Sequence, residues 1–249
     1  MDKRILVKIG GKVAQEPDGI AALADELGAL ARRAGVVLVH GGGVQVTELS
    51  RTLGIEPVFR DGVRMTSDPE MAVVDMVLAG AVNKGLVRGL EARGVRAAGL
   101  SGADGGLVTG ESVDGSSRTG VVRSVRRELL DVLMEAGYVP VLCSVASDAS
   151  GGALNINADD MALAVAVALG CEELVFISDV PGVMAGKSVL PTLGRADAER
   201  EIAAGTIGGG MVPKVRACLE AVAKGVGRVV IADYRSAGDL AKMLAGEKG

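Results

Sequence analysis

The chain has 249 residues, of which 49% are hydrophobic and 23% charged, and its formal net charge is −4. This composition provides a sizeable core and excludes a chain that is disordered throughout. The sequence has no polybasic block of the kind that binds the phosphate backbone of nucleic acids. With two Phe, two Tyr and no Trp, it also lacks a stacking platform for single strands. The single histidine, His40, disfavours a histidine-rich metal site and a Ser-His-Asp triad.

Cysteine usage and hydropathy indicate the compartment. Cys143, Cys171 and Cys218 are far apart and form no CxxC pair or metal-ligand spacing, which is typical of free thiols in a reducing cytoplasm. The apolar run 5–9 is broken at once by Gly10, so it is too short for a signal peptide, and no segment approaches the length of a membrane span. We expect a cytoplasmic protein with no membrane partner.

Short β-branched runs alternate with helical patterns along the chain. Continuous apolar runs predict buried strands at 5–9, 36–39, 97–100, 139–142, 174–177 and 228–231. Helical patterns cover 18–34, 45–53, 68–93, 128–136, 158–169, 197–204, 211–224 and 237–244. Segments 58–66 and 107–125 predict small β-hairpins. We therefore expect a three-layer α/β/α sandwich around a mainly parallel sheet, with small β-hairpins.

The domain organisation follows from the same pattern. No long linker or repeat interrupts the chain, which predicts a single domain over 1–249 with a soft boundary near 148–152. That boundary divides the chain into halves 1–150 and 151–249. Ligands of such folds bind beyond the carboxyl ends of the strands, so the loops that follow the strands are the candidate sites.

Two glycine-rich loops follow the first two strands. Lys8 lies near the end of the first strand, before Gly10, and a lysine there needs an anion or a carboxylate, although a snorkelling side chain before an ordinary turn is the alternative. The second strand ends at His40, and the run Gly41–Gly43 predicts an anion-binding nest rather than a GxGxxG dinucleotide motif. His40 itself is typical of a packed, hydrogen-bonded histidine.

Three segments of the second half invite a functional interpretation. Gly182–Ser188 looks like a P-loop, but three residues instead of four separate its glycines, which excludes a Walker A motif. Asn155–Asp160 contains good N-cap residues, yet more amides and carboxylates than one cap needs. Lys214 lies in the first turn of a helix opened by glycines, where the macrodipole disfavours a cation; a bound anion explains it, and a surface lysine is the alternative.

Eight segments in order resemble the amino acid kinase superfamily and, within it, the acetylglutamate kinase branch. Those at Arg64 and Leu78–Lys84 favour that branch over carbamate, uridylate and aspartate kinases. The eight segments are Val7–Gly11, Val39–Gly43, Asp61–Thr66, Leu78–Lys84, Gly99–Gly105, Asn155–Asp159, Ser178–Val183 and Gly210–Lys214.

The resemblance implies ATP-dependent phosphorylation of the γ-carboxylate of N-acetyl-L-glutamate. By analogy with the family, Lys8 and Lys214 neutralise the transferring phosphoryl group, Asp159 orients both lysines, and Gly11 and Gly43 supply backbone donors. A carboxylate nucleophile needs no general base, which agrees with the scarcity of histidine.

The same resemblance implies where the substrates bind. Acetylglutamate is expected in the first half, with Arg64 holding its α-carboxylate; the matching positions are Gly42, Gly43, Arg64 and Asn155. ATP is expected over the second half, at Asp179, Val180, Pro181, Gly182, Val183, Met184, Thr206, Ile207 and Gly208. Mg²⁺ is expected to be held chiefly by the phosphates and water, with no protein metal site.

Some features depart from the family pattern. Gly209 occupies a position where relatives often carry Asp, which predicts a looser turn before Met211. The chain begins directly in the first strand, whereas arginine-inhibited relatives carry an N-terminal helix that links dimers into hexamers, so we expect an arginine-insensitive homodimer. The helix 68–93 is the candidate dimer contact through its apolar stripe, and an intramolecular core face is the alternative. The stripe consists of Met71, Val74, Val77 and Leu78.

The sequence leaves two alternative functions open. One is a kinase acting on aminoadipate or glutamate attached to a small acidic carrier protein, which is expected to need a basic rim. The arginines near the second hairpin keep this option open, although a solvated face also explains them; they are Arg118, Arg123, Arg126 and Arg127. The other is a non-catalytic sensor of nucleotides or amino acids on the same fold, which the presence of Lys8, Asp159 and Lys214 together argues against.

Overall fold

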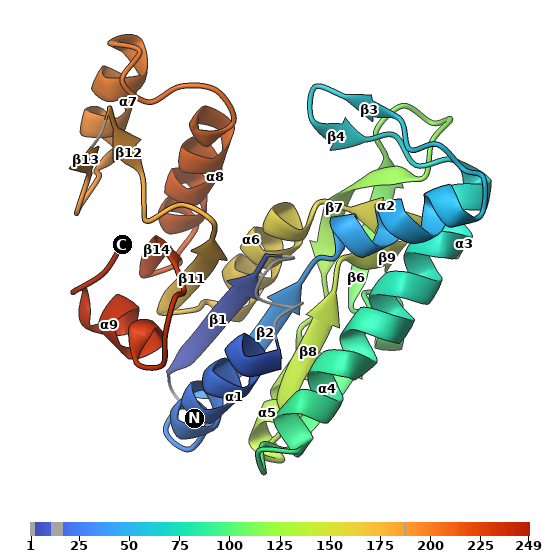
Figure 1. Ribbon diagram of the computed structural model, residues 1–249, viewed down its shortest axis with the longest axis horizontal. Coiled ribbons are helices and arrows are strands. Elements are labelled where there is room, and N and C mark those ends of the chain that lie inside the picture. Colours follow the sequence, from blue (N-terminus) through green and yellow to red (C-terminus); the bar gives the residue numbers. More distant parts are fainter. Residues whose placement is uncertain (1–2, 11–16, 187) are drawn as a thin grey trace.

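The computed structural model describes residues 3–10, 17–186 and 188–249 and shows a central parallel sheet between two layers of helices (Figure 1). Its six strands are adjacent in the order β14-β11-β1-β2-β8-β5. They are β1 (Arg4–Ile9), β2 (Gly35–His40), β5 (Ala97–Leu100), β8 (Val139–Cys143), β11 (Glu173–Ser178) and β14 (Arg228–Asp233). Every strand predicted from an apolar run is confirmed. The predicted α/β/α sandwich is confirmed as well.

Side-chain alternation along the strands creates two apolar cores, one on each face of the sheet. Ile5 and Val7 of β1 point into the first core, whereas Leu6 points into the second. The first core is covered by α1 (Pro17–Ala31), α2 (Gly43–Thr52), α3 (Asp68–Asp75), α4 (Asn83–Glu91) and α9 (Asp239–Ala245). The second is covered by α5 (Glu128–Glu135), α6 (Ala158–Leu169) and α8 (Met211–Ala223). Lys8 lies on the same side of β1 as Leu6 and therefore faces α6 and α8.

The predicted helix 68–93 is confirmed in extent but not in regularity. A π-helical segment, η1 (Met76–Val82), separates α3 from α4. The apolar stripe proposed as a dimer contact is at most 4% exposed and packs inside the protomer, because it faces the sheet. That assignment was wrong, and the intramolecular alternative is correct for Met71, Val74, Val77 and Leu78.

Four short strands form a small closed barrel beside the main sheet. They are β6 (Val108–Ser112), β7 (Thr119–Val125), β9 (Val145–Ser147) and β10 (Ala153–Ile156). The hairpin predicted over 107–125 is confirmed as β6 and β7, which are antiparallel. Because β10 pairs with both β7 and β9, the turn at 148–152 lies within this barrel. The division of the chain there into a substrate half and an ATP half stays a prediction.

Two further hairpins lie outside the main sheet, one after α2 and one after β11. β3 (Phe59–Arg60) and β4 (Val63–Arg64) confirm the hairpin predicted at 58–66; Asp61 and Gly62 both have positive φ, as a type I′ turn requires. β12 (Met184–Ala185) and β13 (Ser188–Val189) form the second hairpin, which precedes α7 (Arg195–Ala203). A hairpin rather than a helix therefore follows Gly182, and the exclusion of a Walker A motif is confirmed.

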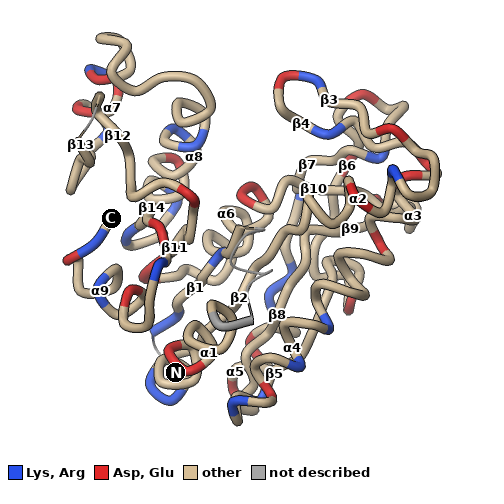
Figure 2. Tube along the Cα trace, in the orientation of Figure 1, with Lys and Arg blue, Asp and Glu red and all other residues tan. Residues whose placement is uncertain are grey.

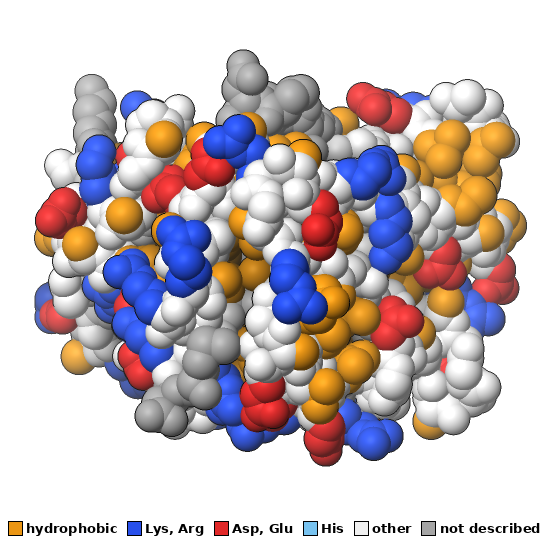
Figure 3. Space-filling model, turned by 90° about the horizontal axis from the view of Figure 1, so that it is seen from below, with side chains coloured by type: hydrophobic (Ala, Val, Ile, Leu, Met, Phe, Trp, Pro, Cys, Tyr) orange, Lys and Arg blue, Asp and Glu red, His pale blue; other side chains and the backbone are white. Residues whose placement is uncertain are grey.

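Charged residues are distributed over the whole fold. Basic and acidic positions are interspersed along the trace (Figure 2), and the face in Figure 3 shows hydrophobic side chains lying between charges of both signs. Among the described residues, no helix is long and apolar enough to cross a membrane.

Candidate active site

Two lysines and one aspartate meet beyond the carboxyl end of β1. Lys8 Nζ lies 2.7 Å from Asp159 Oδ1, and Lys214 Nζ lies 3.0 Å from Asp159 Oδ2. The three side chains come from β1 and from the first turns of α6 and α8, and each is 14–24% exposed. The structure therefore brings together the three residues to which the sequence assigned phosphoryl transfer.

Local structure holds Asp159 in place. Asn157 is the N-cap of α6, and its side-chain oxygen accepts hydrogen bonds from the backbone amides of Asp159 at 2.8 Å and Asp160 at 3.4 Å. The cap fixes the first turn, so that the Asp159 carboxylate points between the two lysines. The segment is therefore a helix cap, as one interpretation predicted, and the same cap positions the carboxylate that contacts the two lysines.

Phe176 is a neighbour of both lysines that the sequence did not reveal. It pairs with Lys8 across β1 and β11, is 1% exposed, and lies with its ring centroid 5.5 Å from Lys214 Nζ. A cation over an aromatic ring is attracted by the negative face of that ring. The Phe176 ring therefore helps to hold the ammonium group of Lys214 in position. Phe176 lies at this point because β11 pairs with β1 in this register.

The charges of this cluster do not cancel. Burial raises the pKa of the Asp159 carboxyl, but the ammonium groups of Lys8 and Lys214 outweigh burial and hold it below 3.8. One carboxylate between two ammonium groups leaves a net positive charge, which suits an anion such as a phosphoryl group. Within the described residues, no group of three His, Cys, Asp or Glu side chains could hold a metal ion.

The glycine loop after β2 is tightly packed at one position and open at the next. Gly42 is buried, and a Cβ on it would lie 2.7 Å from Leu78 Cδ2, so a larger residue there would displace the Leu78 side chain. Gly43 is exposed, with nothing within 4 Å of the position of a Cβ. After β1, the Gly10 amide donates to the Ile177 carbonyl at 3.3 Å, and Gly11 lies outside the described residues.

His40 is fully buried at the end of β2. Its Nδ1 lies 2.9 Å from the Gly41 carbonyl oxygen, and its Nε2 lies 3.0 Å from Asn83 Nδ2. Burial lowers the pKa of His40 to about 4, so the ring is neutral at physiological pH. The interpretation of His40 as a packed, hydrogen-bonded histidine is confirmed.

Arg64, at the end of β4, faces the glycine loop. Its Nη2 donates to the Gly43 carbonyl at 3.0 Å and to Thr47 Oγ1 at 2.6 Å, and its guanidinium lies 4.8 Å from the Phe59 ring centroid. Its Nη1 lies 2.6 Å from Oε1 of Glu70, whose side chain is 2% exposed. Sequence reasoning missed Glu70, because a Glu three residues after Ser67 is the ordinary pattern of a capping box.

Asn155 lies on β10 and is connected to the same region. Its Nδ2 donates to Thr66 Oγ1 at 2.9 Å, and the Thr66 amide donates to Thr119 Oγ1 at 2.8 Å. The Thr119 hydroxyl in turn donates to the Arg64 carbonyl at 2.6 Å. These contacts hold Arg64 and Asn155 beside one another, although 90 residues of sequence separate them.

The segments assigned to ATP lie next to the lysines of the candidate site. Asp179–Met184 follows β11 directly and leads into β12, while Thr206–Gly208 precedes α8. Ile207 is buried against Val215, and Gly209 has a φ of +57°. A glycine adopts this left-handed conformation without strain, which gives the turn before Met211 its shape.

A cleft of about 610 Å³ lies elsewhere, between α8 and the edge strand β14. Of the candidate site residues that the structure describes, Val183 alone lines it, and neither lysine nor Asp159 borders it. The chemistry-bearing groups thus gather at the carboxyl edge of the sheet, as the fold predicts, and not in this cleft.

Together, the parallel α/β/α sandwich and the two ion-paired lysines at its carboxyl edge define an α/β protein with a cationic cluster beyond its strand ends. The chain belongs to the amino acid kinase family, whose model matches residues 3–233.

Relatives with curated names cover nearly the whole chain. An acetylglutamate kinase from Rubrobacter xylanophilus is 43% identical over 244 residues, covering 98% of this chain and 94% of that protein. The chloroplastic acetylglutamate kinase of Arabidopsis thaliana is 39% identical and covers 99% of this chain and 74% of that protein.

Solved structures share the fold. A protein from Streptococcus mutans UA159 superposes with a TM-score of 0.83 at 30% identity, covering 94% of this chain and 96% of that one. The N-acetylglutamate synthase from Neisseria gonorrhoeae, complexed with coenzyme A and N-acetyl-glutamate, also has a TM-score of 0.83. At 22% identity, over 96% of this chain and 56% of that one, it shows the fold alone.

Proposed function

We propose that this chain is an acetylglutamate kinase: it transfers the γ-phosphoryl group of ATP to the γ-carboxylate of N-acetyl-L-glutamate, in arginine biosynthesis. The observation that carries the proposal is the ion-paired arrangement of Lys8, Asp159 and Lys214 at the carboxyl edge of the sheet. Relatives named acetylglutamate kinase, similar over nearly the full length, specify the acceptor.

The chemistry fits the groups that are available. A side-chain carboxylate of ordinary pKa is ionised at neutral pH, so direct in-line attack on the γ-phosphorus needs no general base. The only histidine is buried and neutral, and it is not needed for proton transfer. Transfer between two anions is limited by charge and positioning, which paired ammonium groups supply.

The two lysines share one task in this proposal, and Asp159 has another. Lys8 and Lys214 neutralise the oxygens of the transferring phosphoryl group from two sides, while Asp159 keeps the two ammonium groups apart and oriented. Backbone amides of Gly11 and Gly43 donate to the phosphoryl oxygens. The substrate enters as MgATP, with Mg²⁺ held chiefly by phosphate oxygens and water, as is usual for this ion at phosphoryl-transfer sites.

The two substrates approach this point from opposite halves. ATP lies along Asp179–Met184 and Thr206–Gly208, which flank the lysines. Acetylglutamate lies against Gly42, Gly43 and Asn155, with its α-carboxylate on Arg64. In the free protein, Nη2 of Arg64 donates to the Gly43 carbonyl and to the Thr47 hydroxyl. The α-carboxylate of the substrate replaces one of these two acceptors when it binds. The ion pair with Glu70 supports this by keeping the guanidinium in place.

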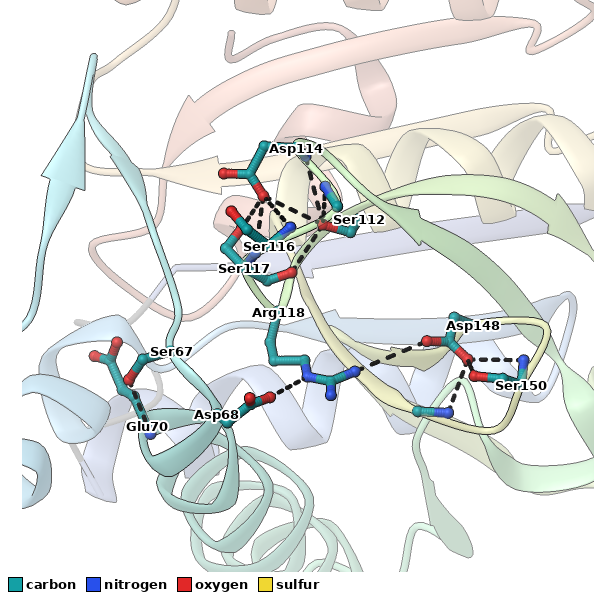
Figure 4. Close-up of polar contacts among 12 residues, drawn as sticks. Ser67, Asp68, Glu70, Ser112, Asp114, Ser116, Ser117, Arg118, Asp148 and Ser150 are labelled. Atoms are coloured by element: carbon teal, nitrogen blue, oxygen red, sulfur yellow. Dashed lines mark hydrogen bonds and ion pairs between the residues drawn. The ribbon is translucent and has the colours of Figure 1, made fainter.

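The carrier-linked alternative gains no support from the arginines near β7. Arg118 pairs with Asp68 and with Asp148 (Figure 4). Its Nη1 lies 3.9 Å from Asp148 Oδ2. Arg123 pairs with Glu111, and Arg127 Nε lies 2.9 Å from Asp131. Carboxylates of the chain itself thus neutralise three of the four arginines, which favours the solvated face. The sensor alternative leaves the intact lysine pair unexplained.

The three cysteines Cys143, Cys171 and Cys218 are free and buried, which supports a cytoplasmic site of action.

The test is acyl-phosphate trapping. Purified protein, MgATP and hydroxylamine are incubated with free N-acetyl-L-glutamate, and with glutamate and aminoadipate in parallel. Hydroxamate that depends on acetylglutamate is the expected result. No signal with any free amino acid contradicts the proposal; nucleotide binding without turnover in the same sample then favours the sensor, and signal only with a carrier-linked acceptor favours the other kinase.

A further inference from the structure

Asn83 and His40 form a buried pair directly behind the glycine loop. Both side chains are fully buried, and Asn83 Nδ2 lies 3.0 Å from His40 Nε2 and 2.8 Å from the Val141 carbonyl oxygen. Asn83 thereby connects α4 to the carboxyl ends of β2 and β8. Neither the ATP segments nor the lysine pair uses these groups.

Two carbonyl groups decide where the imidazole proton lies. The Val141 carbonyl can only accept, so the amide nitrogen of Asn83, and not its oxygen, must face it. That orientation also turns an Nδ2–H toward His40 Nε2, which must then be the unprotonated nitrogen. The proton therefore lies on Nδ1, where the Gly41 carbonyl accepts it at 2.9 Å. The network admits one tautomer of a neutral ring.

The π-helical segment brings Asn83 to this position. In a π-helix each amide bonds to the carbonyl five residues earlier, so residue i+5 returns to the same face as residue i. Leu78 and Val82 consequently face the sheet together with Asn83. A Cβ on Gly42 would lie 2.7 Å from Leu78 and 3.3 Å from Val82. This one turn therefore packs on the glycine loop through Leu78 and Val82, and the side-chain amide of Asn83, the next residue, contacts His40.

We propose that Asn83, presented by the π-helical segment η1, is a positioning residue: it fixes the Nδ1–H tautomer of His40 and thereby orients the Gly41–Gly43 loop toward the acceptor substrate. The connection is direct, because the Nδ1–H group bonds to the carbonyl of Gly41, the first residue of that loop. The effect on substrate rests on the proposed function, whereas the tautomer does not.

The charged and titratable surroundings leave this assignment intact. Lys84, the next residue on α4, lies 3.1 Å from Asn83 Oδ1 through its Nζ and disfavours a second positive charge on the ring. Cys143 lies beside His40 on β8, and burial raises the pKa of its thiol to about 11, so that it stays neutral. No carboxylate of the described residues is within hydrogen-bond distance of either ring nitrogen.

The chain carries its own probe, since it contains one histidine. Protein labelled with ¹⁵N-histidine gives one imidazole in long-range ¹H–¹⁵N spectra, and the ¹⁵N shifts identify the protonated nitrogen. The expected spectrum is that of the neutral Nδ1–H tautomer, unchanged between pH 8 and 5.5, with no substrate present. An Nε2–H tautomer, or titration near the ordinary value of 6.5, overturns the proposal.

Kinetics of Asn83→Ala test the consequence for substrate. Losing the amide is expected to allow both tautomers in the ¹⁵N spectrum and to raise KM for acetylglutamate about tenfold, the equivalent of one hydrogen bond, with KM for ATP unchanged. Leu90→Ala is the matched control: it empties a buried site on the same helix, α4, and is expected to lower Tm while keeping the tautomer and both KM values. If Leu90→Ala raises KM for acetylglutamate equally, Asn83 acts only through stability and the proposal fails.

The two proposals fail in different ways. If no acetylglutamate hydroxamate forms but the substrate-free spectrum shows the Nδ1–H tautomer, the function is wrong and the His40 assignment stands. If acetylglutamate is phosphorylated and Asn83→Ala leaves its KM unchanged, the function stands and the positioning role is wrong.

Discussion

At the scale of single residues, the defining feature is a carboxylate shared by two ammonium groups. Asp159 offers one oxygen to Lys8 and the other to Lys214, so each lysine is held without being neutralised in full. An exposed ion pair contributes little, but these three groups are mostly buried, where charges interact more strongly. Pre-positioned charge of this kind is what phosphoryl transfer requires.

Removing either ammonium group should abolish most of the turnover. Lys8→Met and Lys214→Met are each expected to lower kcat by about 100-fold or more, because charge stabilisation in the transition state is lost, while ATP still binds. Lys224→Met, at the far end of the helix that carries Lys214, is the matched control and should retain normal kcat. Steady-state kinetics and nucleotide titration measure both quantities; wild-type rates in both lysine variants would refute the assignment.

The pKa of Asp159 predicts a pH-dependent contribution to stability. Its folded-state pKa lies below 3.8, so the unfolded state binds the proton more tightly, and the stabilisation is present above 3.8 and lost as the pH falls through the folded value. The free energy of unfolding of the wild type should therefore exceed that of Asp159→Asn clearly at pH 7. Urea titrations at pH 7 and pH 3.5 measure this difference, which should shrink at the lower pH; a constant difference speaks against the ionised, paired state.

At the scale of secondary-structure elements, helix ends decide where the charges lie. The cap by Asn157 shapes the first turn of α6, and the turn through Gly209 leads into α8, so both helices begin at the lysine pair. Negative charge at a helix N-terminus is stabilised by the macrodipole, which favours Asp159 and also an incoming phosphoryl group. Capping, which sequence reading treats as a structural device, is here part of the site.

Loss of the cap should affect activity more than stability. Asn157→Ala is expected to cost about 1 kcal/mol in the free energy of unfolding, as for other N-caps, and to lower kcat because the Asp159 carboxylate loses its fixed direction. Val165→Ala removes buried methyl groups from the same helix away from the site and should destabilise comparably with normal kcat. Equal loss of kcat in the two variants would assign the effect to stability alone.

At the scale of the whole molecule, one continuous sheet connects the two halves of the proposed site. The strands β11 and β14 extend the sheet formed by β1, β2, β5 and β8, so the carboxyl edges of both halves face the same side. The barrel, to which β10 of the second half contributes Asn155, lies beside the hairpin of β3 and β4, which carries Arg64. The acceptor substrate is thus expected beside the barrel, and ATP beside β11.

The expected homodimer belongs to this scale. The apolar stripe of α3 and η1 is used inside the protomer, so a dimer must use other surface, such as the outer face of the same helix, where Met76 is 54% exposed. Light scattering on a size-exclusion column should give twice the mass of one chain, and Met76→Asp should shift it toward a monomer. A single-chain mass for the wild type, or a hexamer, contradicts the expectation, and assays with added arginine test the expected insensitivity.

The sequence by itself determined the strands, most helix positions and the identity of the central triad. Apolar runs of four or five residues are local signals of a parallel sheet, and lysine or aspartate beside glycine loops is recognisable without a structure. The resemblance to the amino acid kinase family grouped Lys8, Asp159 and Lys214, and the structure shows that they are in contact, which no local rule reveals. Their assigned roles, like those of Gly42, Gly43, Arg64 and Asn155, stay predictions.

Only the tertiary structure decided which partners those residues have. Phe176 beside Lys214 and Asn83 behind His40 are contacts between elements that lie far apart in the sequence. Glu70 beside Arg64 is a contact between two successive elements, and it depends on how the chain turns between them. The π-helical segment and the four-stranded barrel also depend on packing, because propensity and periodicity act over a few neighbouring residues and cannot specify pairing at a distance. For the same reason the apolar stripe of the long helix could not be assigned from its pattern: a buried core face and a dimer face have the same periodicity, and only the position of the sheet tells them apart.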